Sequence, residues 1–363
     1  MSAIDGPSLR TLAPRVLVTG GCGFVGCNIA DALARRGDQV LILDNFARPG
    51  SQENADWLRK RHADRVVIER ADIRDEQAVR GLVAQCSAVL HLAGQVAVTT
   101  SLDDPFADFE INARGTLNVL ESIRAAGGHL PVVFASTNKV YGKLLGDEDI
   151  IHSGERYQPK DVRLALGVDE AALLDFYSPY GCSKGSADQY VRDYARVFGL
   201  RTAVLRMSCI YGSRQFGTED QGWIAHFLIR AIRGEAITVY GDGYQVRDAL
   251  YIDDAVNAWL ATLDGIDAVS GRVFNLGGGP SNTVSLREIL TLIEKLRGQA
   301  PEISFDAWRP GDQPWYVSDV RAISAALGWT PKVALKDGLA RLEHWLVQRF
   351  GQAQPALLRE AQA

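Results

Sequence analysis

Short apolar runs alternate with segments of helical spacing along the first half of the chain. The runs lie at Arg15–Thr19, Gln39–Asp44, Arg65–Glu69, Ala88–Ala93, Pro131–Ser136 and Thr202–Arg206, and a seventh run, Arg272–Leu276, follows later. Between them, segments such as Asp75–Cys86 and Phe106–Ala126 carry apolar residues at the intervals that are typical of amphipathic helices. This alternation predicts β–α units that build a parallel sheet with helices on both faces.

A different pattern follows Arg206. Isolated helical segments at Trp223–Arg233, Leu286–Arg297 and Leu335–Gln348 are joined by loops. They predict a smaller mixed α/β lobe that closes over the carboxyl ends of the strands. The charged segment Lys143–Tyr177 interrupts the alternation, and we expect a long excursion near the active cleft. The expected fold is α/β, a Rossmann-type doubly wound parallel sheet of about seven strands with a second lobe.

Glycines mark the turn between the first strand and the first helix. In TGGCGFVG, Gly20 allows a tight turn, Gly23 lets a pyrophosphate approach the backbone, and Gly26 lets the helix sit close to the strand. A glycine triplet is by itself also compatible with a purely structural turn. Here Asp44 ends the second strand, where a carboxylate binds both ribose hydroxyls of a dinucleotide and repels a 2′-phosphate. Asp44 therefore favours NAD over NADP, whereas Arg48 lies close enough in the sequence to bind a 2′-phosphate and leaves NADP as the alternative.

The segment SPYGCSK at residues 178–184 carries candidate acid–base chemistry. Ser178 is a good N-cap and Pro179 a good first residue, so Tyr180 and Lys184 are expected on one helical face, although such a pair also occurs by chance on exposed helices. Lowering the pKa of a tyrosine from about 10 to about 7 requires about 4 kcal/mol, which nearby positive charges supply. Thr137, at the carboxyl end of the preceding strand, is expected to hydrogen-bond the reacting oxygen, with Ser136 facing the cofactor or a neighbouring strand.

Length, composition and net charge limit the architecture of the protein and the classes of molecule that it binds. The 363 residues are 47% apolar and 23% charged, a length that predicts two lobes. A net charge of −5 and a pI near 5.8 argue against nucleic acid and anionic membranes, so an anionic substrate needs local cations. No apolar run has the length of a membrane span, and MSAIDGPSLR lacks a signal peptide's apolar core. The five cysteines and six histidines show no spacing that is typical of a metal site, so none is expected. An odd number of cysteines without a secretory signal predicts reduced thiols and a cytoplasmic location.

From about Arg15 to Trp345 the chain resembles the extended short-chain dehydrogenase/reductase family, the NAD-dependent nucleotide-sugar epimerases and dehydratases. The stretches that carry the resemblance are HLAGQ (91–95), INARGTLNVLE (111–121), GYQVRDALYIDD (243–254) and RPGDQPWYVSD (309–319), together with the two motifs above. The resemblance implies tightly bound NAD and a nucleotide-diphosphate sugar as substrate. It also implies a homodimer or homotetramer, assembled through the helices Phe106–Ala126 and Ser178–Phe198.

The resemblance also implies site residues. The catalytic residues would be Thr137, Tyr180 and Lys184. The cofactor would be bound by Gly20, Gly23, Phe24, Val25, Gly26, Asp44, Asn45, Asp72, Ile73, Leu92, Ala93, Gly94, Asn112, Ser136, Tyr180 and Lys184. The substrate would be bound by Thr137, Tyr180, Gln215, Gln221, Trp223, Arg247 and Arg309, the two arginines gripping its diphosphate. Cys209 stands where the family often has asparagine, which puts that phosphate contact in doubt.

The expected domains follow the same resemblance. Residues 12–207 and 245–276 would form the NAD-binding domain, residues 208–244 and 277–350 the nucleotide-sugar-binding lobe, and residues 351–363 a tail.

The residues after Thr137 help to choose the reaction. Dehydratases of the family carry an Asp–Glu pair there, whereas this chain has Asn138 and Lys139, and neither is a carboxylic acid. With no clear cysteine nucleophile for oxidation to a sugar acid, reversible oxidation and reduction at one carbon remains, which is epimerisation. HLAGQVAVTTS (91–101), STNKVYG (136–142), DFYSPYGCSKGSADQY (175–190) and RQFGTEDQGW (214–223) are most similar to the CDP-tyvelose epimerases (CDP-paratose 2-epimerases), which act at C2 of a CDP-linked 3,6-dideoxyhexose. A UDP-sugar 4-epimerase and a non-catalytic NAD-binding sensor are the alternatives.

Overall fold

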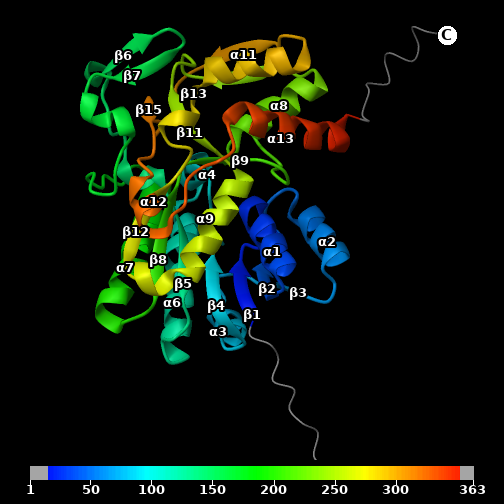
Figure 1. Ribbon diagram of the computed structural model, residues 1–363, viewed down its shortest axis with the longest axis vertical. Helices are drawn as coiled ribbons and strands as arrows, with labels where there is room; N and C mark the ends of the chain where they lie inside the picture. The colour runs from blue at the N-terminus through cyan, green and yellow to red at the C-terminus, as the bar shows by residue number, and fades with distance from the viewer. Residues whose placement is uncertain (1–14, 352–363) are drawn as a thin grey trace, which may run out of the picture.

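A seven-stranded parallel sheet forms the centre of the computed structural model, which describes residues 15–351 (Figure 1). The strand order is β12-β8-β5-β4-β1-β2-β3 and every neighbouring pair is parallel. The strands are β1 (Arg15–Thr19), β2 (Gln39–Asp44), β3 (Val66–Arg70), β4 (Cys86–His91), β5 (Val132–Thr137), β8 (Thr202–Met207) and β12 (Arg272–Leu276). All seven apolar runs therefore lie in one sheet, and the expected Rossmann-type α/β fold is confirmed.

Helices cover both faces of this sheet because each buried strand turns alternate side chains to opposite sides. The helices on one face are α1 (Phe24–Arg36), α2 (Ser51–Arg61) and α9 (Ile252–Asp264), and those on the other face are α3 (Glu76–Val83), α6 (Gly115–Ala125) and α7 (Ser178–Phe198). Val16 and Val18 of β1 pack in one core with the first three helices, whereas Leu17 packs in the other core with the second three.

The segment predicted as one helix over Phe106–Ala126 is divided into three. Helix α5 (Pro105–Phe109) passes into the π-helical turn η1 (Glu110–Arg114), and α6 follows. The turn directs the side chain of Asn112 inward, where its Nδ2 donates to Asp108 at 3.1 Å and to Ser183 at 3.1 Å. A π-turn inside a helix is frequently found at functional sites.

A second group of elements lies beyond the carboxyl ends of the central strands, in the upper part of Figure 1. Its helices are α8 (Trp223–Arg233), α11 (Leu286–Arg297) and α13 (Leu335–Phe350). One small sheet pairs β10 (Ile237–Tyr240) with β14 (Ile303–Asp306). In a second one, β11 (Val246–Tyr251) pairs with β9 (Cys209–Tyr211), β13 (Thr283–Ser285) and β15 (Trp315–Tyr316). β11 thus pairs with strands of this second group. The division into two domains stays a prediction, and residues 12–14 and the tail 352–363 lie outside the described residues.

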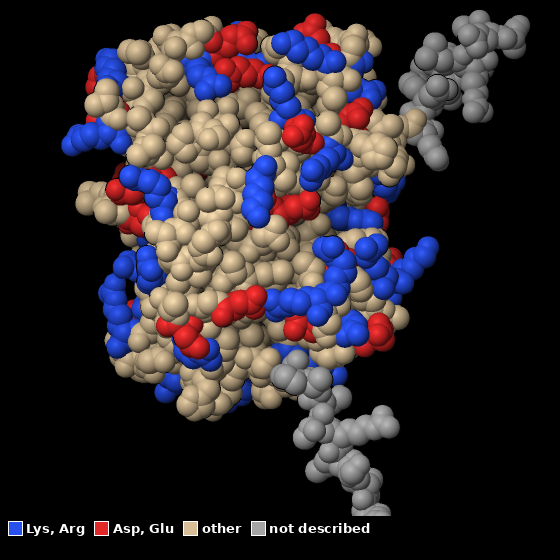
Figure 2. Space-filling model, in the orientation of Figure 1, with Lys and Arg blue, Asp and Glu red and all other residues tan. Residues whose placement is uncertain are grey.

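The excursion from residue 143 to residue 177 contains a hairpin, with β6 (Ile150–Ser153) antiparallel to β7 (Arg156–Pro159). The remaining short elements are α4 (Val98–Asp103), α10 (Ile266–Val269), α12 (Arg321–Leu327), η2 (Asn138–Tyr141), η3 (Asp147–Asp149), η4 (Val162–Leu166) and η5 (Pro280–Asn282). Over residues 15–351, no helix combines the length and the apolar character that a membrane crossing requires. Acidic and basic side chains are interspersed on the face drawn in Figure 2.

Candidate functional site

The turn after β1 leaves no room for a side chain at Gly20 or Gly26. Gly20 has a φ of 67°, and a Cβ atom there would lie 2.8 Å from the backbone nitrogen of Ala93. A Cβ atom on Gly26 would overlap the carbonyl oxygen of Gly20. Helix α1 begins at Phe24 after Gly23, and no side chain caps its N-terminus. The first N–H groups of the helix, including those of Phe24 and Val25, therefore remain available to an anion such as a pyrophosphate.

Asp44 lies beside this turn at the end of β2. Its carboxylate accepts hydrogen bonds from the N–H groups of Cys22 at 2.9 Å and Phe46 at 2.8 Å, so it is held in place from two sides. Burial raises the pKa of Asp44, and the backbone hydrogen bonds oppose that rise. Asn45 follows and donates to Asp72 at 3.0 Å, which joins the loops after β2 and β3. The residues expected at an adenosine ribose therefore form one edge of the site.

The ends of β1 and β4 are joined through one hydroxyl. Thr19 Oγ1 accepts from the N–H groups of Leu92 at 3.2 Å and Ala93 at 3.1 Å, and it lies 2.7 Å from His91 Nδ1. Strand β4 ends at His91, two residues before the apolar run ends. A Cβ atom on Gly94 would lie 2.9 Å from Asn112 Oδ1 and 3.7 Å from Lys184 Nζ. Ile73 packs directly under Gly115, where an added Cβ atom would lie 2.8 Å from its side chain.

Thr137, Tyr180 and Lys184 lie together at the carboxyl end of β5. Their exposed fractions are 7%, 8% and 5%. Helix α7 begins at Ser178, one residue earlier than expected, and Ser178 has a φ of 70° while its Oγ accepts from the N–H of Gly181 at 3.2 Å. The strained residue thus fixes the start of the helix that carries Tyr180 and Lys184.

The charges around Tyr180 do not by themselves make it a base. Burial raises the pKa of Tyr180 to about 12, while a hydrogen bond with Thr137 lowers it and Asp108 raises it. Burial lowers the pKa of Lys184 to about 8, against the opposing effect of Asp188 and Asp108. Lys184 Nζ donates to the Ala135 carbonyl at 2.5 Å and lies 4.3 Å from the centre of the Phe134 ring. Ionisation of the phenol therefore requires a further positive charge.

Ser136 is engaged on the other side of the strand. Its Oγ donates to Asp188 Oδ2 at 2.7 Å, and Asp188 is also paired with Arg206 at 2.9 Å in the core. The hydroxyl thus contributes to a buried network that joins β5, α7 and β8. Its assignment to the cofactor stays a prediction.

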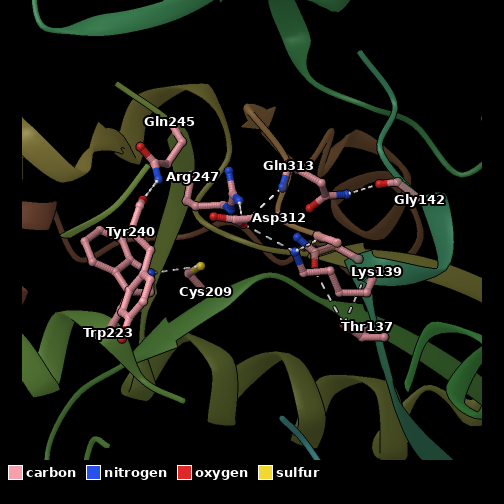
Figure 3. Close-up of polar contacts among 12 residues, drawn as sticks. Thr137, Lys139, Gly142, Cys209, Trp223, Tyr240, Gln245, Arg247, Asp312 and Gln313 are labelled. Carbon is pink, nitrogen blue, oxygen red and sulfur yellow. Dashed lines mark hydrogen bonds and ion pairs between the residues drawn. The ribbon is translucent and has the colours of Figure 1, made fainter. Parts of the chain in front are cut away.

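A cavity of about 340 Å³ opens next to Thr137 and Tyr180. All seven residues predicted to bind the substrate line it, namely Thr137, Tyr180, Gln215, Gln221, Trp223, Arg247 and Arg309. It is also lined by residues outside the predicted substrate-binding set, namely Lys139, Cys209, Glu219, Asp220, Tyr240, Gln245 and Asp312. Figure 3 shows part of this lining.

Both arginines in the cavity are held by carboxylates. Arg247 is 6% exposed; its Nη1 donates to the Val246 carbonyl at 2.8 Å and its Nη2 donates to Asp312. Arg309 lies 3.8 Å from the centre of the Tyr240 ring and donates to the Glu219 carbonyl at 2.8 Å. The guanidinium of Arg309 also lies 3.5 Å from the Glu219 carboxylate. These cations are therefore stabilised in the folded protein before any anion binds.

The loop before α8 supplies the remaining lining. Trp223 Nε1 lies 3.4 Å from the sulfur of Cys209, so the indole donates to the thiol that stands at the family's asparagine position. Gln215 donates to the Ile210 carbonyl at 3.2 Å, and its buried Oε1 has no partner among the described residues. Gln221 accepts from Arg48 at 3.5 Å, which connects this loop to the loop after β2.

Sequence reasoning missed Lys139 and Asp312 as parts of this lining. Both stand in motifs that carry the family resemblance, Lys139 in STNKVYG and Asp312 in RPGDQPWYVSD. The sequence indicates only that Lys139 replaces an acid, and it gives no sign that the two side chains meet. Their proximity, 3.6 Å between Lys139 Nζ and Asp312 Oδ1, joins segments that are far apart in the chain.

The chain is similar to known proteins over most of its length. Residues 16–277 match the NAD dependent epimerase/dehydratase family. The CDP-paratose 2-epimerase of Salmonella typhi is 40% identical over 338 residues, which is 91% of this chain and 98% of that protein. A putative UDP-glucose 4-epimerase of Methanocaldococcus jannaschii is 31% identical, with coverage of 91% and 98%. The structure of the Thermus thermophilus UDP-glucose 4-epimerase in complex with NAD has a TM-score of 0.77 and 32% identity, with coverage of 92% and 98%.

Proposed function

Because the chain belongs to the NAD dependent epimerase/dehydratase family, an NAD-dependent family of nucleotide-sugar enzymes, we propose that it inverts C2 of a CDP-linked 3,6-dideoxyhexose. The observation that favours inversion over loss of water is the pair Asn138–Lys139 beside Thr137 in the cavity, and the 40% identity with a CDP-paratose 2-epimerase supports the choice of C2 and of a CDP-sugar. Elimination of water needs a carboxylic acid at this place, and Asp312, a carboxylate that lines the cavity beside Lys139, is tied to Arg247 and Lys139. Inversion of a carbinol carbon needs no such acid.

The residues around the glycine turn fit NAD. The Gly20–Gly26 turn offers unpaired helix N–H groups to the pyrophosphate, and Asp44 offers carboxylate oxygens to the adenosine ribose. Lys184 and Asn112, which both lie near the position of a Cβ atom on Gly94, would contact the nicotinamide end. When bound, NAD accepts a hydride from the reacting sugar carbon and later returns it.

Within the proposed mechanism, Tyr180 holds the proton that leaves and re-enters the sugar hydroxyl. Thr137 donates a hydrogen bond to the same sugar oxygen and so fixes its position against the phenol. Lys184 keeps a positive charge near Tyr180 and stabilises its phenolate form. The keto sugar turns over within the cavity while its nucleotide diphosphate stays bound, and the returned proton then completes the inverted alcohol.

Retention of the diphosphate is assigned to Arg247 and Arg309. The guanidinium fork suits phosphate oxygens, and both side chains reach the cavity from elements beyond the central sheet. Gln215, Gln221 and Trp223 would contact the rest of the nucleotide sugar. Because Asp312 and Glu219 already bind the two arginines, the diphosphate must compete with these carboxylates.

A UDP-sugar 4-epimerase is the second candidate, since relatives of that name match nearly the whole chain. A non-catalytic sensor is disfavoured because the relatives are enzymes. The decisive assay incubates CDP-paratose and UDP-glucose separately with purified protein and no added NAD. Conversion of CDP-paratose, with deuterium at C2 retained in the product and loss of conversion in Tyr180→Phe, is the expected result. Conversion of UDP-glucose alone, or washout of the deuterium to solvent, would refute the proposal.

We also propose assembly as a homodimer or homotetramer. Phe106 is 86% exposed, Phe109 53%, Val197 62% and Phe198 49%, and all four lie on α5 and α7, the helices expected at the interface. Exposed aromatic and aliphatic side chains of this size are typical of association surfaces. Sedimentation analysis would separate the two states, and a monomer would contradict the proposal. The cytoplasmic location stays a prediction.

A further inference from the structure

We propose that Lys139 binds the sugar-bearing phosphate of the substrate and is the third cation of the diphosphate site. The inference rests on the proposed function, because it requires a nucleotide diphosphate in the cavity. It deepens that function by dividing the diphosphate between named side chains.

Lys139 is placed between the catalytic residues and Arg247. Its backbone N–H donates to Thr137 Oγ1 at 3.2 Å, which ties the residue to the end of β5. Its Nζ donates to the Gly311 carbonyl at 3.0 Å and lies 3.6 Å from Asp312 Oδ1. The side chain is only 21% exposed and lines the cavity. Its ammonium is thus held at a fixed place next to the reacting residues.

The charges at this place do not balance. One carboxylate, Asp312, accepts from Arg247 and pairs with Lys139, so two cations share a single anion (Figure 3). Burial disfavours the charged form of Lys139 and lowers its pKa, while Asp312 opposes that change. An ammonium has three N–H donors, and the Gly311 carbonyl takes one of them. The cluster can therefore accept a further anion, and Lys139 can donate to it.

The order of side chains along the cavity assigns the phosphate. Figure 3 shows Thr137, then Lys139, then Asp312 with Arg247, and finally Tyr240 on the far side. Arg309 stacks on Tyr240 and so belongs to that far end. A substrate whose sugar reaches Thr137 places its sugar-bearing phosphate between Lys139 and Arg247, and its nucleoside phosphate nearer Arg309. A lysine at the first position fixes the point about which the keto sugar turns.

The test measures the binding of CDP and CMP to the NAD-loaded protein by isothermal titration calorimetry. CMP lacks the second phosphate, so only CDP reaches Lys139. We expect Lys139→Met to weaken CDP binding about 10- to 100-fold, the range of a charge-assisted hydrogen bond, and to change CMP binding less than about threefold. Lys139→Arg keeps the charge and should restore part of the CDP affinity. Lys143→Met, an exposed lysine on the next loop, is the matched control and should change neither.

Asp312→Asn separates phosphate binding from a merely structural pair. It removes the carboxylate that competes with the phosphate, so CDP should bind as tightly as before or more tightly. Equal loss of CDP and CMP affinity in Lys139→Met, or loss of CDP affinity in Asp312→Asn as well, would overturn the inference in favour of a role in folding this segment. Unchanged CDP binding in Lys139→Met would overturn the inference about Lys139 and leave the proposed function standing. A wild-type protein that binds neither CDP nor UDP would overturn the proposed function along with it.

Discussion

Removal of NAD is expected to lock Tyr180 in its protonated form. Burial raises the pKa of this phenol to about 12 in the protein without cofactor. Reaching the phenolate at pH 7 from there requires about 7 kcal/mol, at about 1.36 kcal/mol per pKa unit. One unit positive charge about 4 Å away, at an effective dielectric constant of about 20, supplies about 4 kcal/mol, which is about three pKa units. The oxidised nicotinamide carries such a charge, and the reduced form does not.

The assay is an ultraviolet titration of the wild-type protein minus that of Tyr180→Phe, in three states: stripped, loaded with NAD and loaded with NADH. We expect the phenol to titrate several units lower with NAD than in the stripped protein, and to stay high with NADH. Lys184→Met should raise the NAD-loaded value again, because the neighbouring ammonium is lost. Equal pKa values of Tyr180 with NAD and with NADH would refute the reasoning, since the two forms differ in the charge on which it depends.

Three further predictions concern the scaffold of the site. Gly26→Ala should abolish retention of NAD during gel filtration, because its Cβ atom would overlap the Gly20 carbonyl, whereas Gly81→Ala, with nothing within 4 Å of the new Cβ atom, should retain it. Asp188→Asn should lower the free energy of unfolding in urea by about 3–5 kcal/mol, because it leaves Arg206 buried without its partner, and the exposed Asp193→Asn should change it little. Burial lowers the pKa of His91 to about 3. Neutral His91 therefore favours the folded state, and the free energy of unfolding should fall by about 2 kcal/mol between about pH 7 and pH 5, because only the unfolded protein binds a proton at this residue in that range. His91→Gln should remove this pH dependence, and its persistence in the variant would contradict the assignment to His91.

The sequence predicted the central sheet because its signals are local. Each buried parallel strand is a short apolar run, and the glycine turn and the glycine after its last residue bound α1 at residues 24–36. The π-turn η1 had no such signal. It is maintained by tertiary bonds of Asn112, which also accepts from the Gln95 N–H at 2.9 Å, and regular helical spacing in the sequence does not reveal them.

The cavity shows the same distinction. Motif comparison selected seven lining residues, and all seven reach it, because family motifs mark positions that share one site. It gave no partner for any of them. The ion pair of Arg247 with Asp312 and the stacking of Arg309 on Tyr240 join segments separated by long stretches of sequence, and they depend on how two loops fold back over the strand ends. The sequence therefore predicted which residues line the cavity, but it did not predict which charged side chains pair with one another.

That compensation explains how a chain of net charge −5 can receive a dianion. Arg309 faces Glu219 and Asp220, and Asp220 also interacts with Arg48, whereas Lys139 and Arg247 share Asp312 alone. The first cluster therefore holds two cations and two carboxylates, and a diphosphate there must displace Glu219 from Arg309. The second carries an excess of positive charge and attracts it at once. Under the proposed function, this difference in charge favours binding of the phosphates at the catalytic end of the cavity, where Lys139 stands next to Thr137, before Arg309 contacts them.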